Sequence, residues 1–500
     1  MPSRRELIGS GAALLAGAAM DTATSGASAK SSRLPRSVAE TVRLVRSGAV
    51  SAREMVAEAI ARIERINPRC NAVVAKRFDQ ALREAERVDR ALPLAGVPIL
   101  LKDVAMAGEP FYNGNRRYAE VDWRFDHTDL LTQRLLDAGA IVVGFTNVPE
   151  FTSAATTESR LYGPCRNPWN LDHSTGGSSG GAGAAVAAGM VPVAQSSDGG
   201  GSSRIPASAN GLFTIKPSRG RVPLYPGNAA WLDITSSKGV LTHSVGDFAL
   251  MLDLIHGVPP GETVGAPPPA RPYASELSGR LLPLRIGWTT TASGSSDCHP
   301  EAKAAVAKAA RLLAALGHHV REAAPTPFQS GESFEIIMAY WPSKVANRTA
   351  AIEKRLGRKF TPDDVEPDTW AMIEVSRRQS AYDFALGLDR IRDFTLRSLS
   401  WWQDYDLLLT PTTGSPPPRI GVMSAGDKPG RAASAMWGKF APYANITGQP
   451  AASLPLHQTA DGLPLGVQLV AAHWREDLLL QVSAQLEQAA PWRDRVPPLA

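Results

Sequence analysis

The 500-residue sequence is poor in cysteine, and its only three, Cys70, Cys165 and Cys298, include no Cys-x-x-Cys pair. Three cysteines can form at most one disulfide, so a disulfide-framed fold is excluded and we expect the thiols to pack in the interior. The nine histidines include no His-x-x-x-His pair and no Cys/His spacing typical of zinc. The sequence therefore predicts no structural or catalytic metal.

A strong charge of either sign is also lacking. The chain has 53 basic and 48 acidic residues, a net charge of +5, and the basic residues form no run. Nucleic-acid binding needs a basic patch, so we expect no nucleic-acid partner. No stretch reaches the roughly 20 apolar residues that span a bilayer, and we expect no stable membrane association. A hydrophobic content of 44% with 20% charged residues is typical of a globular protein.

The first 29 residues have the three parts of an export address. Arg4 and Arg5 precede a weakly apolar, glycine- and alanine-rich core over residues 7–19, and Ala27-Ser28-Ala29 follows as a small-x-small cleavage site. This order predicts a twin-arginine export signal over residues 1–29 and a bacterial protein located in the periplasm or outside the cell. The alternative is a disordered tail with chance arginines, which would not need all three parts in order.

Two glycine-rich loops, at residues 176–181 and 198–202, are the most informative stretch. Glycine allows backbone N–H groups to converge on a phosphate or on a developing oxyanion. Neither loop has the lysine of a phosphate-binding loop or the G-x-G-x-x-G of a dinucleotide site, so no nucleotide cofactor is expected. What remains is a glycine-flanked serine in each loop, Ser178 and Ser202, beside backbone donors, which suggests acyl transfer. Flexible linkers are the alternative, but apolar segments flank both loops.

Three separated motifs carry a family resemblance. GGSSGG at 176–181, DGGGSSRIPA at 198–207 and GVPILLKD at 96–103 resemble, in order and spacing, the signature of the amidase signature family. Further segments agree, and the resemblance covers roughly residues 36–492. It implies an α/β fold with a mixed, twisted β-sheet covered by helices on both faces, built as a single large domain over residues 30–500. It also implies an amidase, a hydrolase acting on non-peptide C–N bonds, that needs no cofactor.

The resemblance implies a Ser–cis-Ser–Lys triad. Ser202, which closes the tightest glycine run, is the predicted nucleophile, and Ser178 would pass protons between Ser202 and Lys102. A cis peptide is expected before Ser178. Lys102 has to be neutral to act as a base, and burial after an apolar strand would lower its pKa. Ser179 is expected to support Ser178 by hydrogen bonding, or to take its role.

The second loop would supply the oxyanion hole. The predicted donors are the backbone N–H groups of Gly199, Gly200 and Gly201, together with that of Ser202. Asp198 is expected to orient the loop and Arg204 to anchor it. The sequence departs from common family choices at three positions, none of which belongs to the triad: Phe145, Gly199 and Ser203.

The substrate is less well defined. Residues 361–366, 370–372 and 475–481 resemble the branch that contains 6-aminohexanoate cyclic-dimer hydrolases, which implies a small-molecule amide substrate, linear or cyclic. An aryl-acylamidase or a urethanase-like carbamate hydrolase is the alternative. An amidotransferase subunit is disfavoured because an exported protein would not meet aminoacyl-tRNA. A non-catalytic exported binding protein and a homodimer are left open.

The hydrophobic pattern predicts the order of elements. Ser51 and Glu54 are predicted to form a capping box. Residues 258–283, rich in proline and glycine, are predicted to connect two parts, and residues 326–400 to form a helical, aromatic-rich insert. Helices are expected over 37–92, 129–138, 182–188, 300–316 and 476–487, and strands over 99–101, 141–143, 190–194, 284–288, 318–324 and 466–471.

Overall fold

A mixed β-sheet forms the centre of the chain in the computed structural model, which describes residues 35–104, 128–224, 233–259, 261–279, 281–292, 297–424 and 427–500. The chain divides into two units, Met1–Arg33 and Leu34–Ala500, and the second is described here. The predicted export signal over residues 1–29 lies outside the described residues and stays a prediction.

The first part of the sheet has five strands in the order β1-β3-β2-β8-β10. Their bounds are β1 Val73–Lys76, β2 Pro98–Lys102, β3 Ile141–Thr146, β8 Val193–Asp198 and β10 Ser237–Thr242. Strand β2 runs parallel to both β3 and β8, whereas β1 and β10 are antiparallel to their neighbours. Since β2 and β8 are adjacent and parallel, their carboxyl ends, Lys102 and Asp198, lie at the same edge.

The second part has six strands in the order β12-β11-β13-β15-β14-β9. Their bounds are β9 Thr214–Lys216, β11 Arg285–Trp288, β12 His319–Glu322, β13 Leu407–Pro411, β14 Ala451–Gln458 and β15 Pro464–Ala471. Phe213, just before β9, exchanges two backbone hydrogen bonds of 2.9 and 3.1 Å with Thr242 at the end of β10. This bridge joins the two parts. Two short hairpins pair β4 (Glu158–Ser159) with β5 (Gly163–Pro164) and β6 (Arg166–Asn167) with β7 (Asn170–Ser174).

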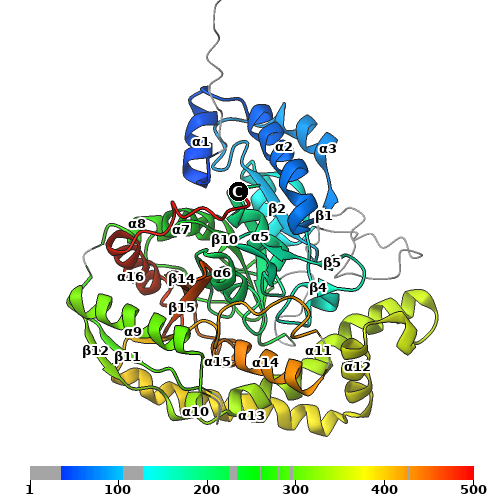
Figure 1. Cartoon of the computed structure of the whole chain (residues 1–500), viewed down its shortest axis with the longest axis vertical. Coiled ribbons are helices and arrows are strands. Elements are labelled where there is room, and N and C mark those ends of the chain that lie inside the picture. Colours follow the sequence, from blue (N-terminus) through cyan, green and yellow to red (C-terminus); the bar gives the residue numbers. More distant parts are fainter. Residues whose placement is uncertain are drawn as a thin grey trace, which may run out of the picture. The chain divides into compact units, whose positions relative to one another are not determined.

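Helices cover both faces of the first part, because its strand residues alternate between two cores. In β2, Ile99 and Leu101 belong to one buried cluster and Leu100 to the other. The first cluster includes α4 (Leu130–Asp137) and α7 (Val245–Ile255), and the second includes α2 (Ala52–Cys70), α3 (Phe78–Ala85) and α5 (Gly180–Ala187). The predicted mixed α/β fold with two-sided helical cover is confirmed (Figure 1).

Eleven helices of the described chain remain, of which the two at Arg204–Asn210 and Pro442–Thr447 are buried over their whole length. Their bounds are α1 Val38–Arg46, α6 Arg204–Asn210, α8 Tyr273–Glu276, α9 Pro300–Ala315, α10 Thr326–Gln329, α11 Glu332–Leu356, α12 Pro367–Arg378, α13 Ala381–Leu399, α14 Lys428–Gly438, α15 Pro442–Thr447 and α16 Glu476–Ala489, with 3-10 turns at Glu150–Thr152, Pro362–Asp364 and Ser400–Gln403. Helices α10 to α13 make up the predicted insert. Helix α11 packs on α12, α13 and α15, which brings the insert against the C-terminal part (Figure 1).

Two predicted elements were wrong in detail. Residues 37–92 were expected to be helical throughout, but β1 interrupts them. Asn71 ends α2 in a left-handed conformation, and the Asn67 side chain accepts hydrogen bonds from the N–H groups of Ala72 and Val73, so the chain leaves the helix there. The strand expected at 190–194 is β8, at Val193–Asp198, because pairing with β10 extends through the polar end of the strand.

Two other predictions, the capping box and the buried cysteines, were confirmed. Ser51 and Glu54 form the capping box of α2. Cys70, Cys165 and Cys298 are free thiols and buried. In the described part of the chain, no helix combines the length and the hydrophobicity that a membrane crossing requires.

Candidate active site

Three elements bring the predicted triad to one edge of the sheet. Lys102 ends β2, Ser178 lies just before α5, and Ser202 follows β8 in the turn that leads to α6. Lys102 Nζ lies 2.7 Å from Ser178 Oγ. The Gly177–Ser178 peptide bond is cis, as expected from the resemblance. Lys102 is 0% exposed, Ser178 1% and Ser202 9%, so all three are buried and the serine predicted to attack is the most exposed of them.

The environment of Lys102 favours the neutral amine. Burial lowers the pKa of Lys102 well below its usual range, and the positive charge of Arg348 lowers it further, while Asp198 acts in the opposite direction. Lys102 Nζ also lies 2.9 Å from Ser197 Oγ. Sequence reasoning did not identify Ser197, because nothing in a strand residue beside the motif indicates that it faces a lysine 95 positions away.

Ser179 and Ser202 tie the two glycine loops together. The Ser179 N–H donates to the Ser202 carbonyl oxygen at 3.2 Å. The Ser179 hydroxyl donates to the Ser197 carbonyl at 3.3 Å and accepts from the Ser197 N–H at 3.4 Å. Among the described residues, the Ser202 hydroxyl has no hydrogen-bond partner. Ser179 therefore supports the loops rather than contacting Lys102.

The oxyanion loop differs from the expectation at one position. The Gly201 N–H donates to Asp198 Oδ1 at 2.7 Å, so it points into the loop and not toward a substrate. Gly201 has a φ of +121°, and a Cβ there would lie 2.6 Å from the Ala441 Cβ, so this position requires glycine. Within the described chain, the N–H groups of Gly199, Gly200 and Ser202 have no acceptor and remain the candidate oxyanion donors.

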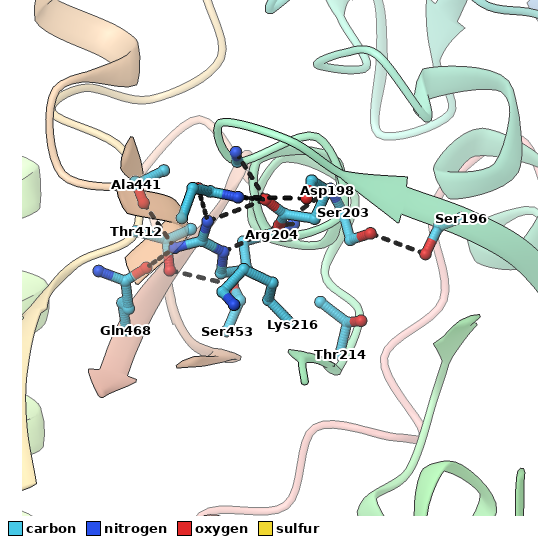
Figure 2. Close-up of polar contacts among 12 residues, drawn as sticks. Ser196, Asp198, Ser203, Arg204, Thr214, Lys216, Thr412, Ala441, Ser453 and Gln468 are labelled. Carbon is cyan, nitrogen blue, oxygen red and sulfur yellow. Dashed lines mark hydrogen bonds and ion pairs between the residues drawn. The ribbon is translucent and has the colours of Figure 1, made fainter. Parts of the chain in front are cut away.

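A buried network stands behind this loop (Figure 2). Arg204 donates from Nε to Asp198 Oδ2 and from Nη2 to Asp198 Oδ1, both at 2.9 Å. Its other bonds reach the C-terminal part of the chain: Ala441 O at 2.9 Å, Gln468 Oε1 at 2.6 Å and Asn445 Oδ1 at 2.6 Å. Burial alone would raise the pKa of Asp198, but Arg204 and the Asn445 amide hold it below the usual range. Asp198 thus stays ionised and the loop is fixed from behind.

The structure shows the surroundings of the three positions that depart from the family pattern, Phe145, Gly199 and Ser203. The Ser203 hydroxyl donates to Ser196 Oγ at 2.8 Å, and both are buried (Figure 2). Phe145 lies in the core beside β2. At Gly199, a Cβ would lie 3.1 Å from Trp341 Cη2 and 3.3 Å from Lys344 Nζ. The glycine therefore allows helix α11 to approach the oxyanion loop.

Helix α11 places charged residues beside the site that sequence reasoning did not identify. Lys344 Nζ lies 2.6 Å from Asp233 Oδ1 and donates to Thr235 Oγ1 at 3.0 Å and Ser236 Oγ at 2.8 Å. One turn later, Arg348 Nη1 donates to Phe151 O at 2.6 Å and Thr152 Oγ1 at 2.7 Å. We refer to Trp341, Lys344 and Arg348 of this helix as the α11 wall. From the sequence, only the aromatic content of the insert indicated this region.

Nothing in the described ranges resembles a metal centre: no three of their His, Cys, Asp and Glu side chains come together as ligands. The residues that do come together are a buried lysine whose pKa is lowered, two serines and backbone donors. This is the arrangement of a serine-based acyl transfer site.

Comparisons with known proteins agree with this chemistry. A family model described as Amidase matches residues 54–480. A 6-aminohexanoate-cyclic-dimer hydrolase from Paenarthrobacter ureafaciens is 40% identical over 473 residues, covering 91% of this chain and 95% of that protein. Among solved structures, a 6-aminohexanoate cyclic dimer hydrolase complexed with substrate matches with a TM-score of 0.88 at 38% identity, covering 94% of this chain and 99% of the other. A bacterial aryl acylamidase of the amidase signature family matches with a TM-score of 0.83 at 28% identity, covering 91% and 96%. The chain therefore belongs to the amidase signature family and is a hydrolase that acts on carbon–nitrogen bonds.

Proposed function

We propose that the protein hydrolyses carboxylic amides through an acyl-enzyme on Ser202, with Ser178 and Lys102 as the proton relay. The observation that carries this proposal is the buried 2.7 Å contact between Lys102 Nζ and Ser178 Oγ, in a loop whose Ser179 N–H donates to the Ser202 carbonyl oxygen at 3.2 Å. Only a neutral amine can accept a proton, and burial favours that form.

The steps follow from this arrangement. Neutral Lys102 takes the Ser178 proton as Ser178 takes that of Ser202, and the Ser202 oxygen attacks the amide carbon. The N–H groups of Gly199, Gly200 and Ser202 stabilise the oxyanion. The C–N bond then breaks as the relay returns a proton to the leaving amine. Water attacks the acyl-enzyme by the same route, which releases the acid and restores Ser202.

Ser197 has a defined part in this relay. A neutral amine carries two N–H donors and one lone pair. When the Lys102 amine donates to Ser197 Oγ, 2.9 Å away, its lone pair is free to face Ser178. Ser197 is thus a positioning residue for the base.

For the substrate, we favour small linear or cyclic amides related to 6-aminohexanoate oligomers. The support is the 40% identity to 6-aminohexanoate-cyclic-dimer hydrolase over 91% of the chain. Aryl amides are the second candidate, because the aryl acylamidase shares the fold at a TM-score of 0.83 and Trp341 lies against the oxyanion loop. We also propose that the enzyme acts outside the cytoplasm, because residues 1–29 have the pattern of a twin-arginine export signal.

The test combines labelling with turnover. A serine-directed fluorophosphonate should modify the purified protein once, at Ser202, and Ser202→Ala should lose both the label and amide hydrolysis, by at least about 10³-fold in kcat. Ser203→Ala is the matched control, since it removes the adjacent hydroxyl but keeps the nucleophile, and labelling should persist. Hydrolysis by Ser202→Ala within about tenfold of the wild type would overturn the assignment. A panel of cyclic amides, linear amides, anilides and carbamates then ranks the substrates.

A further inference from the structure

The guanidinium of Arg348 lies near the proposed catalytic residues, and only one of its three nitrogen atoms makes hydrogen bonds within the described residues. Its Nη1 is fixed by two hydrogen bonds, to Phe151 O and Thr152 Oγ1. Within the described residues, its Nε and Nη2 donate to no acceptor, and neither atom is among the buried groups that lack a partner. The Nε–Nη2 edge is therefore open to solvent or to a bound molecule.

The same edge binds carboxylates elsewhere in this chain. Arg204 uses Nε and Nη2 to hold Asp198, with both distances at 2.9 Å. Arg271 uses the same two atoms to hold Glu276, with both distances at 2.6 Å. This side of a guanidinium offers two parallel N–H groups that match the two oxygens of a carboxylate. In Arg348 the same two groups contact no carboxylate of the described residues.

The carboxylate nearest to Arg348 by its electrostatic effect, that of Asp233, forms an ion pair with another residue. Asp233 is close enough to Arg348 to influence it electrostatically, but its ion-pair contact is with Lys344, at 2.6 Å. Lys344 and Arg348 lie one turn apart on α11 and so share a face. Among the described residues, Asp233 is the carboxylate that acts on Arg348, and its ion pair is formed with Lys344.

This charge lies by the reaction centre. Lys344 Nζ is 3.3 Å from where a Cβ at Gly199 would be, in the oxyanion loop. Arg348 acts electrostatically on Lys102. Lys344 therefore lies against the oxyanion loop, and Arg348, one turn later on α11, lies within electrostatic range of Lys102.

We propose that Arg348, through its Nε–Nη2 edge, binds a carboxylate group of the substrate, so that the enzyme prefers amides that carry a carboxylate over neutral amides. The proposal rests on the proposed function in taking the same site as the place of hydrolysis. It narrows the substrate class from small amides to acid-bearing amides, such as an acylated ω-amino acid with a free carboxyl end.

The test measures binding without turnover. In the Ser202→Ala protein, calorimetry compares 6-acetamidohexanoate with its methyl ester, which differ in the carboxylate charge. A bidentate, charge-assisted pair predicts that the acid binds about 10- to 100-fold more tightly than the ester. Adding Arg348→Gln should reduce this preference to within about twofold. Arg378→Gln, which removes an exposed charge from α12, is the matched control and should leave the preference unchanged.

Each outcome decides the question. Equal binding of acid and ester with Arg348 intact overturns the proposal, and this comparison needs no Arg348 variant to fold. An acid preference that survives Arg348→Gln also overturns it, because another cation would then be responsible. Turnover of neutral anilides by the wild-type protein without any acid preference would leave the amidase assignment standing and remove only the carboxylate site. Tighter binding of the acid without any amide hydrolysis would support the carboxylate site and remove the amidase assignment.

Discussion

The Asp198–Arg204 pair gives the sharpest test of how the oxyanion loop is held. Arg204→Met removes a guanidinium that is 0% exposed and makes five hydrogen bonds, two of them to Asp198. Methionine fills much of the same volume, so the variant removes charge and donors more than packing. The Asp198 carboxylate, itself 1% exposed, is left without its cation.

The expected cost is large. Removing one partner of a buried ion pair typically costs about 3–5 kcal/mol, because the other charge stays buried and uncompensated. We therefore expect the free energy of unfolding to fall by at least about 3 kcal/mol. Asp198→Asn combined with Arg204→Met should recover part of this loss, since the amide still accepts from the Gly201 N–H but carries no charge.

The pH dependence has a defined sign. In the wild type the pKa of Asp198 is lowered, so the pair contributes stability above the unfolded pKa of about 3.9 and loses it as pH falls through the folded pKa. In Arg204→Met, burial raises the pKa of Asp198 above the unfolded value, so stability falls as pH rises. The stability gap between wild type and variant should therefore be smaller at pH 5 than at pH 8.

Urea unfolding followed by tryptophan fluorescence measures these differences at both pH values. Steady-state amide hydrolysis measures the effect on the loop, where kcat should fall because the candidate oxyanion donors lose their support. A loss of stability below about 1 kcal/mol, an equal loss at both pH values, or no recovery in the double variant would each refute the reasoning.

Three further predictions concern other parts of the chain. Gly199→Thr should raise KM more than it lowers kcat, because the new side chain displaces the α11 wall. Steady-state kinetics measure both constants, and an unchanged KM would contradict this prediction. Arg348→Gln should move the acid limb of the pH–rate profile to higher pH, because the pKa of Lys102 rises when the nearby positive charge is lost, and an unmoved limb would argue against it. A chain that starts at Lys30 should be folded and active, and replacing the arginine pair at 4–5 by lysine should retain active enzyme in the cytoplasm; equal extracytoplasmic activity in cell fractions would count against the export signal.

The sequence by itself determined the residues of the proposed chemistry. The resemblance of three short motifs to the amidase signature implied Lys102, Ser178 and Ser202, and such local motifs can be found in a sequence without knowledge of the packed fold. The apolar run before Lys102 likewise predicted a buried strand and a buried amine, and both are present. The alternation of strands and helices predicted a sheet covered by helices on both sides, and the family resemblance implied that the sheet is mixed.

Only the tertiary structure decided what surrounds those residues. Ser197 contacts Lys102 because β2 and β8 are neighbours, and Arg204 reaches Gln468 across 264 positions. The direction of the Gly201 N–H depends on the Asp198 carboxylate, and the α11 wall of Lys344 and Arg348 comes from a helix more than 130 residues beyond the glycine loops. Hydrophobic periodicity reports which face of an element is buried but not which element buries it. Contacts between charged and polar groups far apart in sequence therefore had to come from the packed fold.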